Sequence, residues 1–249
     1  MSKHVLITGA ATGFGKLCAL ELAARGHHVI ATTETNDQAA ALRGEAPQLQ
    51  VEKLDITTND VEKVHEWDID VLIDNAGAGE TGPIADVPLQ RVRHLFEVNV
   101  FGTLAVTQAV LKNMVAKKSG RIIIMSSIAG VLSAPAFGPY AMTKHALEAM
   151  GKAMRAELAP LGIDVTLINP GPYLTGFNDR MADSMWEWFG EQSLNGSESE
   201  LFRVIGNFVT TGQRDPQEVG DKLVELVEAE TTTENNFVPE DIRAQLGLG

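Results

Sequence analysis

Two patterns of apolar and polar positions alternate along this chain of 249 residues. Short runs rich in β-branched residues, apolar at nearly every position, predict parallel strands that are buried on both faces. They are His4–Thr8, His28–Thr33, Gln50–Leu54, Val71–Asp74, Gly120–Ser126, Ile163–Asn169 and Asn236–Val238. Between them, apolar residues recur at helical spacing and predict helices over 14–25, 37–43, 59–66, 89–117, 139–159 and 216–229. The alternation predicts an α/β fold, a Rossmann-like doubly wound parallel sheet of about seven strands with helices on both faces.

One segment departs from this alternation, between the sixth predicted strand and the last predicted helix. Residues 171–212 carry Trp186, Trp188, Phe177, Phe189 and Phe202. An excursion of this length is more typical of a functional or mobile segment than of a simple connection. Its amphipathic part, 181–189, either packs on the rest of the chain or covers the crevice as an apolar lid, and we favour a lid at about 171–212. No repeat or linker divides the remainder, so we expect one domain over residues 1–249.

The net charge and the hydropathy of the chain indicate which kinds of molecule it does not bind. The chain has 33 acidic and 20 basic residues, a net charge of −13, and such a surface repels nucleic acid and anionic lipid. No apolar run approaches the ~18 residues of a membrane-spanning helix. The N-terminus leads straight into a strand without a signal-peptide layout. We therefore expect a cytoplasmic protein with no nucleic-acid partner and no membrane partner.

Thiol and metal chemistry find no support in the sequence. Cys18 is the single cysteine, which excludes an intrachain disulfide and a cysteine-based metal cluster. Its helical neighbours Leu17, Leu20 and Leu22 indicate a position in the core. The six histidines include no i, i+4 pair, so we expect no metal site.

The first predicted strand is followed at once by a glycine-rich turn and a helix start. The glycines of Thr8–Gly15 are spaced G-x-x-x-G-x-G, and glycine lets a backbone turn sharply and approach a ligand closely. The free N–H groups and the positive dipole at a helix N-terminus favour an anion. Such turns also occur at purely structural ends, but the place within a β-α-β unit favours a dinucleotide pyrophosphate. The residues concerned are Gly9, Thr12, Gly13, Phe14 and Gly15.

Acidic and amide residues end other predicted strands. Glu34 lies about 20 residues beyond the glycines, where a carboxylate binds a ribose 2′-hydroxyl and repels a 2′-phosphate. NAD is therefore favoured over NADP, although Glu34 reads equally well as a solvated loop residue. Asp55 ends the third strand and Asn75-Ala76-Gly77 follows the fourth, at the same predicted edge of the sheet. Asp55 reads alternatively as a helix cap, and the Asn75 motif as a loop turn.

Tyr140 and Lys144 are four residues apart in a predicted helix and so lie on one face. A free phenol has a pKa of about 10, and an adjacent ammonium favours the phenolate. We therefore expect Lys144 to lower the pKa of Tyr140, so that the phenol exchanges a proton closer to neutral pH. Such pairs are common at protein surfaces; the glycine turn, and Ser126-Ser127 at the end of an apolar run, give this one its weight.

Together these motifs resemble the short-chain dehydrogenase/reductase family, in its single-domain branch of about this chain's length. The resemblance runs from Lys3 to about Leu174. It is carried by Thr8–Gly15, Asp55, Asn75–Gly77, Asn99–Gly102, Ser126-Ser127, Gly138–Tyr140, Lys144, Asn169–Gly171 and Thr175. Asp74 stands where the family often has asparagine, and Thr143 where serine commonly precedes the lysine. Both departures leave the motif set intact.

The resemblance implies a catalytic tetrad of Asn99, Ser127, Tyr140 and Lys144. Family spacing selects Ser127 over Ser126 to hydrogen-bond the substrate oxygen, while Tyr140 exchanges a proton with that oxygen during hydride transfer. Lys144 lowers the tyrosine pKa and binds the nicotinamide ribose. Asn99, at a position in its helix where we expect a kink, holds a water linked to Lys144. The implied cofactor contacts are Gly9, Thr12, Gly13, Phe14, Gly15, Glu34, Asp55, Ile56, Asn75, Ala76, Gly77, Tyr140, Lys144, Pro170, Gly171 and Thr175.

The activity that the resemblance implies is hydride transfer between a nicotinamide cofactor and a secondary alcohol or ketone. The aromatic residues of 171–212 favour a hydrophobic or aromatic substrate, and Tyr173 is a candidate substrate contact. An NADP-dependent ketone reductase of the same family and a nucleotide-binding sensor without turnover are the alternatives. In the family, the helices that carry the asparagine and the tyrosine usually pair between subunits. The apolar surface of 89–117 agrees with this, so we expect a homodimer or homotetramer.

Overall fold

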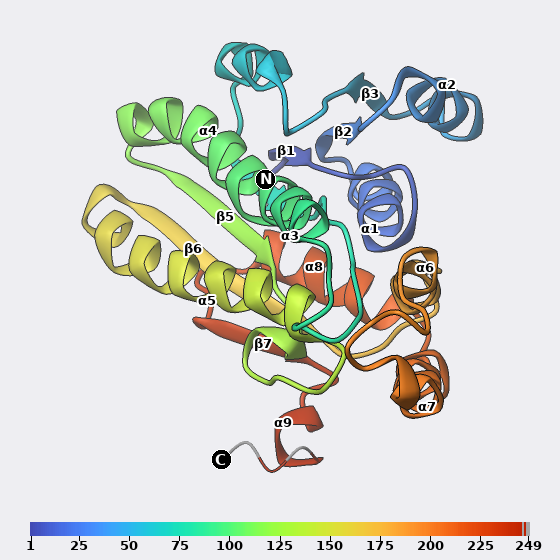
Figure 1. Ribbon diagram of the computed structural model, residues 1–249. Helices are drawn as coiled ribbons and strands as arrows, with labels where there is room; N and C mark the ends of the chain where they lie inside the picture. The colour runs from blue at the N-terminus through green and yellow to red at the C-terminus, as the bar shows by residue number, and fades with distance from the viewer. Residues whose placement is uncertain (246, 248–249) are drawn as a thin grey trace.

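Seven parallel strands form the centre of the computed structural model, which describes residues 1–245 and 247 (Figure 1). The strands are β1 (His4–Ile7), β2 (His28–Thr33), β3 (Gln50–Lys53), β4 (Val71–Asp74), β5 (Gly120–Met125), β6 (Ile163–Pro170) and β7 (Asn235–Val238). They lie in the order β3-β2-β1-β4-β5-β6-β7, and every neighbouring pair is parallel. The predicted doubly wound sheet is confirmed, and each predicted strand matches an observed one to within a residue at either end.

The winding direction reverses between β1 and β4, which are neighbours in the sheet. In sheets of this kind ligands bind outside the carboxyl ends of the strands at the reversal point. The glycine turn after β1, the Asn75 motif after β4 and Ser127 after β5 all emerge at this edge. The topology alone therefore gathers three of the predicted motifs.

Helices cover both faces of the sheet. They are α1 (Gly13–Ala24), α2 (Asn36–Glu45), α3 (Leu89–Phe96), α4 (Thr103–Lys117), α5 (Gly138–Leu158), α6 (Phe177–Ser184), α7 (Ser199–Thr210), α8 (Gln217–Glu228) and α9 (Ile242–Gln245). On one face α1 and α8 pack together over Val5, Ile7 and Ile73, with Cys18 fully buried among them as predicted. On the other face α4 and α5 cover Leu6, Leu72, Ile122 and Ile124 (Figure 1). Alternate residues of each strand thus contribute to two separate cores.

The predicted helix 89–117 is interrupted in its middle. Between α3 and α4 the chain forms a π-helical turn at Glu97–Gly102, and Asn99 lies inside it. Within Leu89–Lys117 a window of 18 residues has a mean hydropathy of 1.2, so by length and composition this stretch passes for a membrane-crossing helix, contrary to the expectation that no apolar run is long enough. In the structure α4 packs on the sheet through Val106, Val110 and Met114, as a core helix does.

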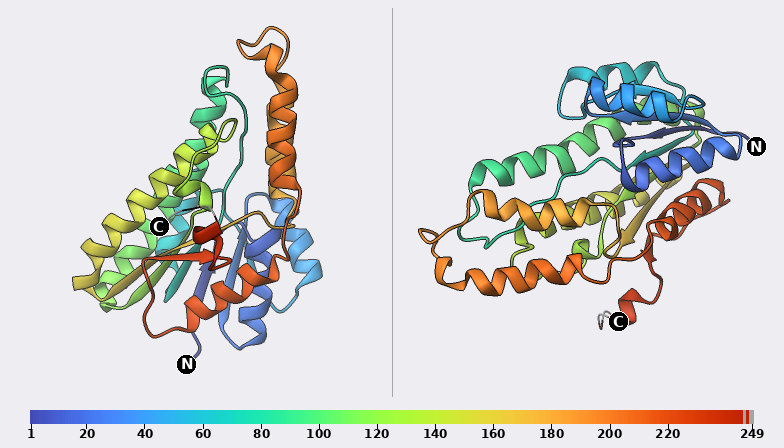
Figure 2. Two further views of the ribbon diagram at one scale, coloured as in Figure 1. Left: turned by 90° about the horizontal axis from the view of Figure 1, so that it is seen from below. Right: turned by 90° about the vertical axis from the view of Figure 1, so that its right-hand side faces the viewer.

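Residues 171–212 form a helical hairpin that stands out from the sheet (Figure 2). One arm is α6, continued by a short turn at Met185–Glu187, and α7 returns beside it. The arms join through Phe189 and Phe202, whose ring centroids are 5.5 Å apart in an edge-on arrangement. The amphipathic stretch 181–189 lies on the end of α6 and the turn that follows it, and neither α6 nor α7 was among the predicted helices.

Candidate active site

The glycine turn closes tightly against the end of β4. Gly9 has a φ of +65°, and a Cβ there would lie 2.7 Å from the Cα of Ala76. A Cβ on Gly15 would lie 2.5 Å from Nδ2 of Asn75. Helix α1 begins at Gly13, with Thr12 as N-cap, and in this helix no capping side chain and no acidic first-turn residue meets the free N–H groups. The helix N-terminus is thus left for an external anion, which fits the predicted pyrophosphate.

Asn75 fastens the glycine turn to β4. Its Nδ2 donates to the carbonyl oxygens of Thr8 and Gly9 at 2.9 and 3.0 Å. The hydroxyl of Thr8 in turn accepts from the backbone N–H groups of Asn75 and Ala76, each at 3.0 Å. Four hydrogen bonds between two successive motifs hold the turn in one shape, so the loop at Asn75 has at least a structural role, as the alternative reading has it.

The segment after β6 lies against the other side of the glycine turn. A Cβ on Gly13 would lie 3.4 Å from the Cβ of Thr175, and Gly171 donates its N–H to the carbonyl oxygen of Val238 at 2.9 Å. Pro170 is the last residue of β6. The predicted contacts after β6 and after β1 are therefore neighbours in space, although about 160 residues separate them in the chain.

Tyr173 is not available to a substrate. Its side chain is 1% exposed, its ring meets that of Phe14 edge-on at 5.7 Å, and its hydroxyl donates to Oε2 of Glu218 at 2.8 Å. The prediction of a substrate contact at Tyr173 is wrong, because the side chain is buried and its hydroxyl is already bonded to Glu218.

At the outer end of the crevice Glu34 is exposed directly beyond β2. Lys53, a cation on which the charge of Glu34 acts, forms an ion pair with Asp60. Asp55 is half-buried, and its Oδ1 accepts from the N–H and the hydroxyl of Thr57 at 2.9 and 2.7 Å. The carboxylate thus closes a local turn, whereas the cap of the following helical segment is Thr58, so Asp55 is not the helix cap of the alternative reading. The next residue, Ile56, is buried beside the π-helical turn.

Tyr140 and Lys144 are buried on one face of α5, 7% and 4% exposed. Lys144 Nζ lies 5.6 Å from the centre of the Tyr140 ring and donates to the carbonyl oxygen of Met125 at 2.7 Å. Ser127 follows β5 close enough to the phenol for its side chain to lower the pKa of Tyr140, whereas Ser126 points away and donates to Glu148. The structure therefore brings Ser127, and not Ser126, to the phenol.

Burial changes the proton affinities of both groups. It raises the pKa of Tyr140 well above its usual value, and the side chain of Ser127 opposes this only in part. It lowers the pKa of Lys144 to about 8, while the negative charge of Glu148 acts in the other direction. The expectation that the pKa of Tyr140 lies below that of a free phenol is thus wrong for this arrangement, because loss of hydration outweighs the favourable contacts.

Asn99 fastens the segment after β4 to α5. Its Oδ1 accepts from the N–H of Ala78 at 2.7 Å, and its Nδ2 donates to the Ala78 carbonyl at 2.9 Å and to the Thr143 hydroxyl at 3.0 Å. Thr143 donates onward to the carbonyl oxygen of Tyr140 at 2.8 Å. All hydrogen-bonding atoms of the Asn99 side chain are thus engaged in protein contacts. The water that we expect Asn99 to hold beside Lys144 would therefore have to bind a backbone group of the π-helical turn.

The helical hairpin reaches the phenol. Phe177 and Met181 of α6 join Phe137 and Tyr140 in one apolar cluster, and the rings of Tyr140 and Phe177 are 5.8 Å apart. Trp188, just beyond α6, donates its indole N–H to Oε1 of Glu80 at 3.1 Å. Arg91 binds Oε2 of the same buried carboxylate at 2.9 Å and forms an ion pair with Glu187. The segment after β4 and the hairpin are therefore held together across the crevice.

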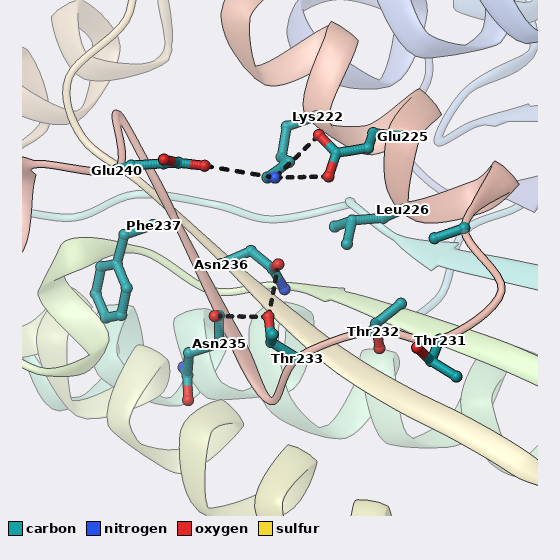
Figure 3. A pocket seen from close by; sticks show the side chains of 11 residues that line it. Lys222, Glu225, Leu226, Thr231, Thr232, Thr233, Asn235, Asn236, Phe237 and Glu240 are labelled. Atoms are coloured by element: carbon teal, nitrogen blue, oxygen red, sulfur yellow. Dashed lines mark hydrogen bonds and ion pairs between the residues drawn. The ribbon is translucent and has the colours of Figure 1, made fainter.

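Two further observations bear on alternative sites. A hollow of about 370 Å³ lies beside β7 and α8, but its Lys222 sits between Glu225 and Glu240, at 2.8 and 3.9 Å (Figure 3). That lysine is already paired with carboxylates, and none of the residues predicted for the site lines the hollow. Within residues 1–245 and 247, no group of three or more His, Cys, Asp or Glu side chains is placed to hold a metal ion.

Several residues of the site region had not been anticipated from the sequence. Glu148 and Glu80 are buried carboxylates, 4% and 6% exposed, and Asn235 lies at the start of β7 against Glu148. A helical face that carries Tyr140 and Lys144 also carries the residue four positions further on, and this was the available signal for Glu148. Glu80 and Asn235 depend on contacts between distant segments and leave no local signature.

Comparison with known proteins agrees with this geometry. The profile of the family described as short chain dehydrogenase matches residues 3–186. The uncharacterized oxidoreductase YusZ of Bacillus subtilis is 35% identical over 241 residues, 90% of this chain and 84% of the relative. The NADPH-dependent 3-dehydrocapnine reductase of Ornithobacterium rhinotracheale is 35% identical over 187 residues, 70% of this chain and 66% of the relative.

Among solved structures, a short-chain dehydrogenase from Streptomyces avermitilis superposes with a TM-score of 0.78 at 26% identity, covering 99% of this chain and 96% of that one. Proteins of this kind bind NAD or NADP and act on small molecules. With the glycine turn, the seven-stranded parallel sheet and the match over most of its length, this chain belongs to the short-chain dehydrogenase/reductase family of oxidoreductases.

Proposed function

We propose that the protein interconverts a secondary alcohol and a ketone, with Ser127, Tyr140, Lys144 and Asn99 as its working residues. The observation that carries this is the buried group at the carboxyl end of β5, where the Ser127 hydroxyl meets the phenol and Lys144 lies 5.6 Å from the ring. Buried polar groups are kept where they do chemistry or hold structure, and a perturbed pair in a crevice favours the first reading.

The nicotinamide cofactor, once bound, supplies or accepts the hydride at the substrate carbon. In ketone reduction the substrate oxygen then takes the proton of Tyr140, while the Ser127 hydroxyl stabilises the charge that develops on that oxygen. Lys144 counters the phenolate that remains. Because burial raises the pKa of Tyr140, the phenol is kept protonated at neutral pH, which suits a proton donor. Oxidation requires the phenolate, and the positive charge of an oxidised nicotinamide favours it.

We propose that the dinucleotide lies across the glycine turn, with Gly9, Thr12, Gly13, Phe14 and Gly15 at the pyrophosphate. Glu34 would bind the adenosine ribose beside Asp55 and Ile56, and Pro170, Gly171 and Thr175 would flank the nicotinamide. The loop Asn75–Gly77 supports this placement, because it connects the glycine turn to Lys144. Asn75 bonds the glycine turn, and a Cβ on Gly77 would lie 4.0 Å from Lys144 Nζ.

NAD is the cofactor we propose, rather than NADP. A 2′-phosphate needs an unpaired cation close to the end of β2. Glu34 is exposed there, and its neighbour Lys53 is paired with Asp60, so the local charge is unfavourable to a phosphate. Because one relative is described as NADPH-dependent, the dissociation constants of NADH and NADPH should be measured side by side. Tighter binding of NADPH would overturn this part.

The substrate we propose is hydrophobic or aromatic. The cluster around the phenol consists of Phe137, Phe177, Met181 and Leu95, and gives few hydrogen-bond partners to a polar substrate. Residues 171–212 would act as a lid within a single domain. Phe101 and Met142, which are 54% and 45% exposed in the segments that carry Asn99 and Tyr140, support a homodimer or homotetramer.

The test is Tyr140→Phe, with Tyr173→Phe as a matched control. Both remove one hydroxyl from a buried tyrosine, but only Tyr140 is placed at the proposed reaction centre. With a panel of aryl and alkyl methyl ketones and NADH, we expect Tyr140→Phe to lose roughly 10² to 10⁴ in kcat while NADH still binds. Tyr173→Phe should keep its rate. NADH binding without turnover by the unaltered protein across the panel would favour the sensor instead.

A further inference from the structure

A buried carboxylate lies one helical turn beyond Lys144. Glu148 is 4% exposed and lies at the i+4 position from Lys144 on α5, on the face that also carries Tyr140. Burying an ionised carboxylate is costly unless hydrogen bonds replace its lost water. The contacts of Glu148 therefore decide whether it is kept as a charge.

Three strands supply neutral donors to this carboxylate. Oε1 accepts from Ser126 Oγ and from Asn169 Nδ2, both at 2.6 Å, and Oε2 accepts from Asn235 Nδ2 at 2.8 Å. Lys152, on the outer side of α5, approaches Oε2 to 3.4 Å. Short bonds of this kind are typical of an ionised carboxylate. They link α5 to the residue that follows β5, to the end of β6 and to the start of β7.

The same donors position the candidate active site. Ser126 precedes Ser127 directly, and Asn169 Nδ2 also donates to the carbonyl oxygen of Ser127 at 3.1 Å. There is no spare room at this junction, because a Cβ on Gly130 would lie 2.6 Å from Ser126 Oγ and 2.9 Å from Glu148 Cγ. Glu148 thus connects the helix of the phenol to the peptide that carries the serine.

The carboxylate also acts on Lys144 through its charge. The titratable groups that face Lys144 are Tyr140 and Glu148, both on its own helix, while β5 presents the carbonyl oxygen of Met125. Burial lowers the pKa of Lys144 to about 8, and Glu148 is the group that opposes this. Without the negative charge, the lysine would lose its proton at a lower pH.

We propose that Glu148 is a positioning residue of the reaction put forward above: its carboxylate fixes Ser127 relative to the α5 helix and keeps Lys144 in its ammonium form. The inference rests on the proposed function for its effect on turnover. It acts through Ser127 and Lys144 and itself touches neither substrate nor cofactor.

Glu148→Gln and Glu148→Asp separate the two effects, and Glu157→Gln, at an exposed position of the same helix, is the matched control. For ketone reduction, we expect Glu148→Gln to move the alkaline limb of the kcat/KM profile down by about one pH unit, the lower end of the effect of a nearby opposite charge. Glu148→Asp keeps the negative charge, but its side chain is too short to make the same hydrogen bonds. Its kcat should therefore fall at every pH, while the alkaline limb of its kcat/KM profile should stay at the same pH. Glu157→Gln should match the unaltered protein.

An alkaline limb in Glu148→Gln at the same pH as in the unaltered protein overturns the electrostatic part. A kcat of Glu148→Asp equal to that of the unaltered protein overturns the positional part. If Glu148→Gln does not fold, Ser126→Ala tests position alone, and an unchanged kcat in that variant contradicts the proposal.

A measurement without turnover separates this inference from the proposed function. The ¹³Cε resonance of Lys144, assigned by its loss in Lys144→Met, is titrated in the unaltered protein and in Glu148→Gln. We expect the midpoint to fall in the variant whether or not any ketone is reduced. Equal midpoints refute the inference, whereas a shifted midpoint in a protein that reduces nothing refutes only the proposed reaction.

Discussion

Asp74 offers the most direct test of the electrostatics of this fold. It is the last residue of β4, 3% exposed, and its Oδ2 accepts from the Thr107 hydroxyl at 2.7 Å. Its Oδ1 is buried and has no hydrogen-bond partner among the described residues. Asparagine has the same shape without the charge, so Asp74→Asn removes the ionisation and leaves the packing.

The shift in the pKa of Asp74 sets how much the substitution changes the free energy of unfolding. Burial raises the pKa of Asp74 from 3.8 to about 7, and the bond from Thr107 opposes this. The folded protein therefore binds this proton more tightly than the unfolded chain does. The resulting stability is present in full below the unfolded pKa and is lost as the pH rises through about 7. Three pKa units correspond to roughly 4 kcal/mol across this window.

The assay is urea unfolding at fixed protein concentration between about pH 4 and about pH 9. Groups common to both proteins cancel in the difference. We expect the unfolding free energy of Asp74→Asn, relative to the unaltered protein, to rise with pH by up to roughly 4 kcal/mol. Thr107→Val removes the contact that lowers the pKa of Asp74 and should move the loss of stability to higher pH. Parallel pH curves for Asp74→Asn and the unaltered protein would refute the reasoning.

Three other substitutions, one of them with a matched comparison variant, test separate parts of the site. Gly9→Ala forces a Cβ to 2.7 Å from Ala76 at a positive φ; we expect a loss of about 1–3 kcal/mol in urea unfolding and weaker NADH binding by fluorescence, and unchanged values would contradict the packing. Glu34→Arg replaces the proposed ribose ligand by a cation and should raise the ratio of NADPH to NADH kcat/KM roughly tenfold or more; a constant ratio would exclude Glu34 from the cofactor. Asn99→Leu removes three hydrogen bonds and should lower kcat by about 10²-fold, whereas Thr143→Val, which loses one of them, should cost less; equal rates in both variants would argue against a positioning role for Asn99.

The sheet was predictable because its information is local. Strands such as Val71–Asp74 are apolar at consecutive positions and end in short polar motifs, so both their type and their boundaries follow from nearby residues. The order of the strands places those motifs at one edge, and the glycine turn, Asn75 and Ser127 met there as expected. The kink expected at Asn99 is a π-helical turn, since a mid-helix asparagine has a poor helix propensity and here bonds a distant peptide.

Other features depend on contacts that no short segment contains. Tyr173 is adjacent to the site motifs in sequence, yet Glu218 and Phe14 hold it in the core, so proximity along the chain misled the prediction of its role. The pKa of Tyr140 was misjudged for a related reason. The i, i+4 spacing reveals only Lys144, a neighbour whose positive charge favours the phenolate. The burial that raises the pKa of Tyr140 depends also on α6, whose Phe177 packs on the phenol from another part of the chain.

Burial of this kind also explains why the tyrosine and the lysine cannot be understood as an isolated pair. The same loss of hydration raises the pKa of Tyr140 and lowers that of Lys144, so each change favours a neutral pair over a charged one. A charged Lys144 then needs a permanent anion, and the ionised form of Glu148 is maintained in turn by Ser126, Asn169 and Asn235. Proton transfer at the phenol therefore depends on residues of three strands that never approach it. For this reason a substitution at Asn235, in the last strand, should alter the pH dependence of the reaction more than its maximal rate.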